Sequence, residues 1–141
     1  MRLEDLERAL EFVLERHGVP EGEVSVLLTD DGEMRRLNQR FRGVDEATDV
    51  LTFPAPDGLE GQVGDIAVSM DFARRGAESR GVPIEEEAAM LVIHGGLHLA
   101  GYDDETEEER GKMSHMMNEA ASALGLACDE GWASQPHGGT A

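Results

Sequence analysis

His94-Gly-Gly-Leu-His98-Leu-Ala-Gly101-Tyr-Asp103-Asp104 is the most informative stretch of this chain, and it follows the apolar run 88–93. The apolar run predicts a buried helix that continues through both histidines. Two histidines four residues apart lie on one face of a helix, so both imidazoles can reach one cation. Gly101 allows a sharp turn, after which a carboxylate can return as a third ligand.

The third ligand has several candidates in the sequence. Asp104 is the expected one, and three protein ligands would leave a fourth position open to water, as a catalytic zinc-type site requires. Asp103 and His115 are alternatives. Asp104 could instead cap the next helix, because Asp104-x-x-Glu107 and Thr106-x-x-Glu109 both have the form of a capping box.

Gly95 stands where zinc proteases carry a glutamate that serves as general base, so the usual protease base is missing. Together with Gly96 it lies inside the predicted helix, where each glycine costs roughly 1 kcal/mol relative to alanine. We therefore expect another element, or a substrate backbone, to approach the helix closely at this pair.

Four motifs together indicate a known family. The histidine stretch resembles the His-Gly-x-Leu-His-Leu-x-Gly-Tyr-Asp-His signature of the YbeY family, bacterial metal-dependent endoribonucleases of ribosomal RNA maturation. The resemblance spans about residues 1–127, with Asp104 in place of the final motif histidine. The other matching segments are Leu37-Asn38-Gln-Arg40-Phe41-Arg42-Gly43, Thr48-Asp49-Val50-Leu51-Thr52-Phe53-Pro54 and Gly64-Asp65-Ile66.

The resemblance implies a single-strand-specific endoribonuclease of 16S ribosomal RNA maturation and ribosome quality control. It implies one divalent ion, with zinc expected, held by His94, His98 and Asp104, and it assigns Asp103 to capping or to support of the ligands. Arg42 matches the motif arginine, which implies a guanidinium that holds the scissile phosphate. The alternative for Arg42 is a surface ion pair with a nearby acid such as Asp45 or Glu46.

The resemblance also implies ribosomal RNA and the ribosomal small subunit, or its assembly factors, as partners. Two other functions are compatible with the same site residues. One is a metal-binding ribosome-assembly factor without catalysis, and the other is a metalloprotease-like hydrolase, against which Gly95 argues. A structural zinc domain fits least well, because only three ligands are visible.

The composition is strongly acidic for a protein that binds RNA. Thirty acidic residues face twelve basic ones, giving a formal net charge of −18, whereas phosphate binders usually carry a basic face. The arginines cluster at 35–42 and 74–80, which would allow one arginine-rich edge, while the acidic runs are expected to solvate helix surfaces. One cysteine, Cys128, fits a reducing cytoplasm, and the chain has no apolar run of the ~20 residues that a membrane span needs.

The pattern along the chain predicts one α+β domain over residues 1–128, with a small mixed β-sheet, about five helices and the histidine helix at the centre. Residues 129–141 lack periodicity and are expected to be disordered. Strands are expected at 23–29, 49–53 and 64–69, and helices at 3–17, 33–40, 70–80, 84–100 and 105–124.

Overall fold

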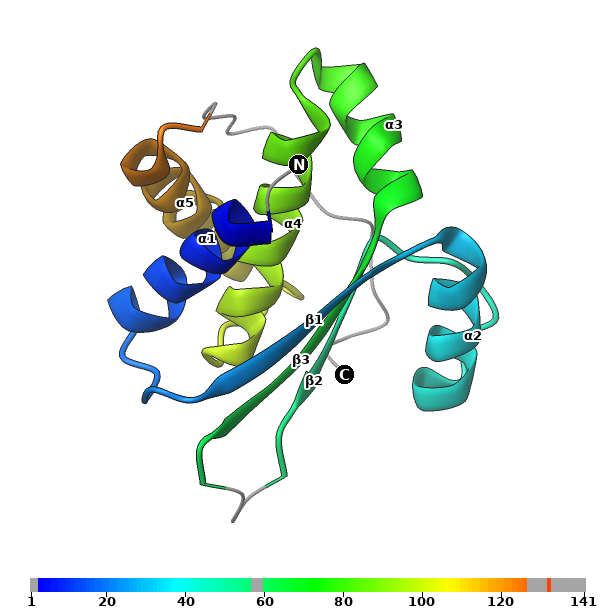
Figure 1. The fold of residues 1–141 in the computed structure, drawn as a ribbon, viewed down its shortest axis with the longest axis horizontal. Coiled ribbons are helices and arrows are strands. Elements are labelled where there is room, and N and C mark those ends of the chain that lie inside the picture. The colour runs from blue at the N-terminus through cyan, green and yellow to red at the C-terminus, as the bar shows by residue number, and fades with distance from the viewer. Residues whose placement is uncertain (1–2, 57–59, 127–131, 133–141) are drawn as a thin grey trace.

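A three-stranded sheet separates two unequal layers of helices in the computed structural model, which describes residues 3–56, 60–126 and 132 (Figure 1). Within these residues the elements follow one another as α1 (Leu3–Arg16), β1 (Glu23–Thr29), α2 (Asp31–Arg42), β2 (Val50–Pro54), β3 (Gln62–Ser69), α3 (Met70–Arg80), α4 (Ile84–Leu99) and α5 (Glu107–Leu124). The α+β fold with five helices is confirmed.

The sheet is mixed, as predicted. Its order is β1-β3-β2, with β1 parallel to the central β3 and β2 antiparallel to it. Two predicted strand bounds were slightly wrong: β2 lies one residue later than expected, and β3 begins at Gln62 rather than at Gly64. The early start of β3 extends its ladder with β1, where Glu23 pairs with Gln62.

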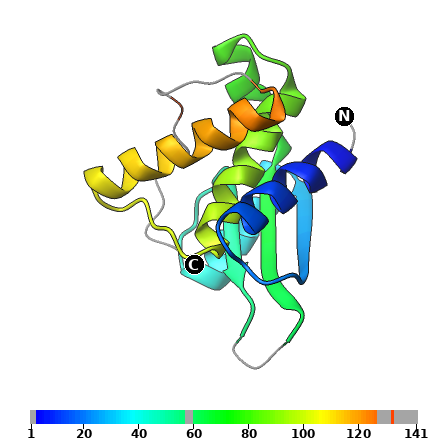
Figure 2. The ribbon, with the colours of Figure 1, turned by 90° about the vertical axis from the view of Figure 1, so that its left-hand side faces the viewer.

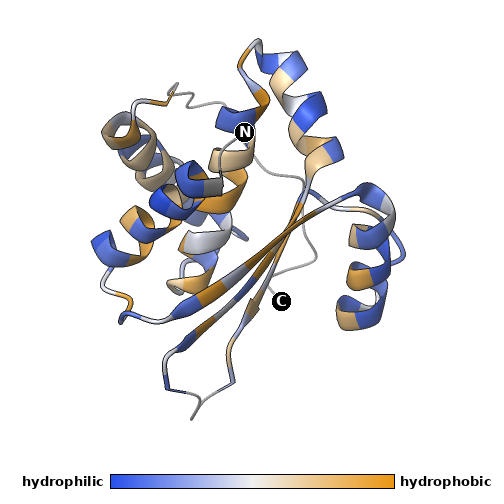
Figure 3. Ribbon diagram, viewed as in Figure 1, coloured by the Kyte–Doolittle hydropathy of each residue, from blue (hydrophilic) through white to orange (hydrophobic). Residues whose placement is uncertain are grey.

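Helix α4 is the centre of the larger layer. It packs against α1, α3, α5, β2 and β3, and its residues from Glu87 to Leu97 are all buried. Figure 2 shows α1, α4 and α5 together on one side of the sheet. On the opposite face α2 places Met34 against Leu51 and Ala67, and in Figure 3 hydrophobic residues follow the strands while hydrophilic residues recur along α2.

Two glycines let α4 approach its neighbours closely. A Cβ on Gly95 would lie 3.0 Å from Ile66 Cγ2 and 3.3 Å from Thr52 Cγ2, on the sheet. A Cβ on Gly96 would lie 2.9 Å from Leu10 Cδ1, on α1. The close approach expected at this pair is therefore confirmed, and burial against two elements offsets the low helix propensity of glycine.

Side-chain caps set where α2 and α5 begin. The α2 cap is Asp30, whose side chain accepts a hydrogen bond from the Glu33 amide at 2.9 Å. Helix α5 begins at Glu107, two residues later than predicted, because Thr106 and Glu109 form a reciprocal capping box. The alternative box from Asp104 to Glu107 is wrong, which leaves the Asp104 carboxylate available for another role.

Two predictions concern the end of the chain. Cys128 and the predicted disordered tail 129–141 lie outside the described residues, except for Trp132, which is buried with 8% of its surface exposed. None of the helices in the described part of the chain combines the length and the apolar character needed to cross a bilayer.

Gly64 carries the sharpest backbone constraint in the sheet. Its φ is +155°, and an added Cβ would lie 2.6 Å from the Phe53 carbonyl oxygen of β2. We predict that Gly64→Ala lowers the free energy of unfolding by about 2–3 kcal/mol through backbone strain and this clash. Gly111→Ala, in open space on α5, should raise it by up to about 1 kcal/mol. Urea unfolding of both variants tests this, and equal stability of Gly64→Ala and wild type would contradict it.

Candidate metal centre

The side chains of His94, His98 and Asp104 converge in a small triangle. The two Nε2 atoms lie 3.0 Å apart, and Asp104 Oδ2 lies 3.2 Å from His94 Nε2 and 3.4 Å from His98 Nε2. These three residues form a group that could hold one metal ion. The structure therefore brings together the three ligands that the sequence predicted.

The triangle has the dimensions of a metal site. Ligand atoms about 2.0–2.1 Å from a tetrahedral ion lie roughly 3.3 Å from one another, which matches the observed 3.0–3.4 Å. The donor set, two imidazoles and one carboxylate, is also one that divalent zinc accepts. The three residues thus fit a divalent ion with one further position left for a non-protein ligand.

Burial differs between the ligands. The side chains of His94 and His98 are 4% and 5% exposed, whereas that of Asp104 is 21% exposed. Hydrogen bonds from the two histidines hold the pKa of the Asp104 carboxyl far below its usual range, despite partial burial. Asp104 is therefore an ionised carboxylate at the solvent side of the triangle, where it could serve as an oxygen ligand.

The loop between α4 and α5 positions Asp104. Gly101 turns the chain with φ +103°, as the sequence predicted, and the Tyr102 amide donates to the Leu97 carbonyl at 3.0 Å. After Asp104, Arg110 Nη1 donates to the backbone carbonyls of Asp104 and Glu105 at 3.3 and 2.8 Å. Contacts on both sides therefore fix the backbone that carries the third ligand.

The other predicted site residues lie elsewhere. Asp103 and His115 are exposed and do not belong to the ligand group. Arg42 ends α2, which packs on the sheet face opposite α4. The alternative, a pair between Arg42 and Asp45 or Glu46, is not found among the described residues, and Asp45 pairs instead with Arg35 at 2.7 Å. Asn38 is buried, and its Nδ2 donates to the Glu46 carbonyl at 2.9 Å, which holds the loop after α2.

A buried network that the sequence did not predict supports the first ligand. The Trp132 ring packs at 52° to the His94 ring, with 5.6 Å between their centroids. Trp132 Nε1 donates to Glu87 Oε1 at 2.6 Å, and Arg80 Nη1 donates to Glu87 Oε2 at 2.5 Å. Glu87 is 5% exposed, so this member of the acidic run does not solvate the surface as expected. Its seven-residue spacing from His94, two helical turns on one face, is the signal that could have indicated the network.

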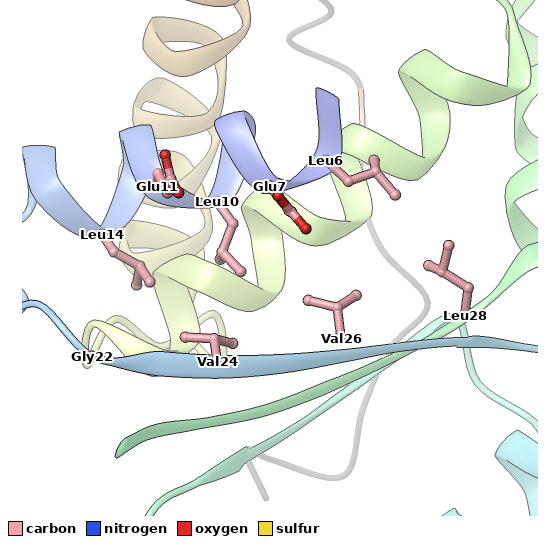
Figure 4. Close-up of a pocket in the computed structure, with 9 residues that line it drawn as sticks. All are labelled: Leu6, Glu7, Leu10, Glu11, Leu14, Gly22, Val24, Val26 and Leu28. Atoms are coloured by element: carbon pink, nitrogen blue, oxygen red, sulfur yellow. The ribbon is translucent and has the colours of Figure 1, made fainter. Parts of the chain in front are cut away.

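An apolar groove lies away from this centre, between α1 and β1 (Figure 4). It has a volume of about 350 Å³. Gly96 faces α1, and His94 lies about 200° around the helix from Gly96. The groove and the ligand triangle therefore occupy opposite sides of α4. The groove is lined by Leu6, Glu7, Leu10, Glu11, Leu14, Gly22, Val24, Val26 and Leu28.

The fold and the triangle together define a class: a small α+β protein whose central helix and following loop carry a three-residue group that could hold one metal ion with a position left open. A family model described as Endoribonuclease YbeY matches residues 2–125. The chain therefore belongs to the YbeY family.

Individual relatives agree with the family match. A protein from Chelativorans named Endoribonuclease YbeY is 43% identical over 86% of this chain and 78% of its own length. One of the same name from Bacillus licheniformis is 38% identical over 89% of this chain and 87% of its own length. A solution structure from Thermotoga maritima is 36% identical and superimposes with a TM-score of 0.57, covering 86% of this chain and 82% of that one.

The ligand assignment predicts how metal content responds to substitution. Asp104→Ala should weaken metal affinity by more than about 100-fold, because it removes a direct ligand. Asp103→Ala and His115→Ala are matched controls, since both side chains are exposed outside the triangle, and both should keep full metal content. Competition with a chelating dye measures the affinity. Full affinity in Asp104→Ala, together with a loss in either control, would show that another residue is the third ligand.

Proposed function

We propose that this protein is a metal-dependent endoribonuclease that cleaves single-stranded RNA during ribosomal RNA maturation. The observation that carries the proposal is the open three-ligand triangle of His94, His98 and Asp104 in a chain of the Endoribonuclease YbeY family. Zinc is the ion we propose, because two imidazoles and a carboxylate at tetrahedral spacing suit it. The proposed setting is the cytoplasm, with ribosomal RNA and the small ribosomal subunit or its assembly factors as partners.

The site residues have different roles in phosphodiester cleavage. A divalent ion in the triangle would supply Lewis acidity toward a phosphoryl oxygen and toward water. His94 and His98 would hold that ion from a buried helix, and Asp104 would lower the net charge of the site by one unit relative to three histidines. Arg42, at the end of α2, would bind a phosphate of the RNA strand through its guanidinium fork.

Proteolysis is disfavoured by the packing of α4. A zinc protease needs a glutamate directly after the first histidine, and here a Cβ at Gly95 would already meet Ile66 and Thr52 at 3.0 and 3.3 Å. A carboxylate base cannot be accommodated at that position without moving the sheet. A role in ribosome assembly without catalysis is compatible with the same metal-binding residues. RNA binding without metal-dependent cleavage would support that role.

The phosphate-binding role of Arg42 predicts a selective loss of activity. Arg42→Ala should lower the rate of RNA cleavage by about 10- to 100-fold, as expected when a charge-assisted hydrogen bond to an RNA phosphate, worth about 1.5–3 kcal/mol, is removed. Its metal content should stay normal, because Arg42 is on α2 and not in the triangle. Arg36→Ala is the matched control on the same helix, since Glu33 already pairs with Arg36 at 2.7 Å.

Cleavage is measured on a labelled single-stranded RNA with and without a metal chelator. Wild-type and Arg36→Ala protein should cleave only with metal present. Cleavage at the wild-type rate by Arg42→Ala would refute its role, and cleavage that survives the chelator would refute the metal-dependent mechanism.

A further inference from the structure

Phe41 is an aromatic side chain exposed to solvent near the end of α2. It is one of four phenylalanines in the chain, and 57% of its surface is exposed. Phe53 of β2 contacts it edge to face, with 5.2 Å between ring centroids and an angle of 61°. The guanidinium of Arg40 lies 5.2 Å from the centroid of the Phe41 ring. Phe53 and Arg40 therefore hold the ring in place, and more than half of the Phe41 surface is still open to solvent.

The charges around this ring differ from those on the rest of α2 and on α3. Arg40 and Arg42 flank Phe41 in the sequence, and neither has a carboxylate within 4.0 Å among the described residues. The other arginines of α2 and α3 are neutralised in ion pairs: Arg35–Asp45, Arg36–Glu33, Arg74–Asp71, Arg75–Asp31 and Arg80–Glu87. In a chain of net charge −18, the end of α2 combines an open aromatic ring with two uncompensated cations.

We propose that Phe41 is a stacking platform for one unpaired RNA base, with Arg40 and Arg42 binding phosphates on either side of it. The proposal rests on the proposed ribonuclease function and names how the strand is recognised. Aromatic rings bind bases of any sequence through their π faces, and flanking arginines follow the backbone. A base can reach such a ring only when it is unstacked, so the platform selects single strands over duplexes.

The position of the platform links it to the metal centre. Thr52 and Phe53 are neighbours on β2 and point to opposite faces of the sheet. Thr52 contacts α4 at Gly95, next to His94, whereas Phe53 contacts Phe41 on α2. Because β2 is an edge strand of the three-stranded sheet, an RNA strand that passes over this edge would meet Phe41 on one side and the ligand triangle on the other.

Binding to oligomers with and without bases tests the proposal. The full-length protein with its metal is titrated with labelled oligodeoxythymidylate, which lacks the 2′-hydroxyl, and with an abasic deoxyribose phosphate oligomer of equal length. Fluorescence anisotropy reports both affinities. Phe41→Ala should weaken binding of the thymidylate by about tenfold and leave binding of the abasic oligomer unchanged, whereas Phe41→Trp should restore thymidylate binding. Arg40→Ala should weaken both, because it removes a phosphate contact.

Leu27→Ala is the matched control, because Leu27 is also exposed, at 48%, but lies on β1. It should bind both oligomers as the wild type does. Unchanged thymidylate binding by Phe41→Ala would overturn the proposal and leave a protein partner as the ligand of this ring. Equal losses for both oligomers would also overturn it. The assay needs no cleavage, so a protein that binds bases through Phe41 but cuts no RNA would refute only the nuclease function.

Discussion

The close packing of α4 is the constraint on which the rest of the structure depends. Gly95 brings the helix against Ile66 and Thr52 of the sheet, and Gly96 brings it against Leu10 of α1. With these two directions occupied, the remaining face carries Glu87, His94 and His98. The ligand face is thus a consequence of how the helix is buried, and a larger side chain at either glycine would rotate or displace both imidazoles together.

Buried neighbours also hold the His94 ring in position. The Trp132 ring lies against His94, and Glu87 fixes the indole while Arg80 neutralises Glu87. Gly76 makes room for this carboxylate, because a Cβ there would lie 2.9 Å from Glu87 Oε1. A buried acid is costly unless it is paired, so the pairing with Arg80 is what allows Glu87 to hold the indole without destabilising the core.

The acidic composition is compatible with RNA binding because the charges are distributed unevenly. Most arginines of α2 and α3 are bound to carboxylates within their own region, so they add little to the external field. Arg40 and Arg42, which have no ion-pair partner among the described residues, lie together at the end of α2, beside an exposed ring. Within α2 and α3, attraction to phosphate is therefore concentrated at this end of α2, in a protein whose net charge of −18 opposes non-specific binding of nucleic acid.

Local patterns in the sequence were sufficient for much of the fold and for the ligand triangle. The two histidines converge because they are four residues apart on one helix, and the chain turns at Gly101. Both features depend only on neighbours in the chain, and both are found as predicted. The indole contact could not be predicted in this way, because Glu87 and Trp132 are separated by 45 residues. The pairing of Arg35 with Asp45 is another case: the charge pattern indicated an arginine-rich edge, but not which arginines are neutralised.

X-ray absorption spectroscopy of the zinc-loaded protein tests the central claim most directly, because it counts the ligands around the ion. We expect one zinc per chain with two imidazoles and two oxygen ligands, one from Asp104 and one from solvent, at about 2.0–2.1 Å. Asp104→His should change the count to three imidazoles and one oxygen. A third imidazole in the wild type, a sulfur ligand, or four protein ligands with no solvent position would contradict the open centre of His94, His98 and Asp104.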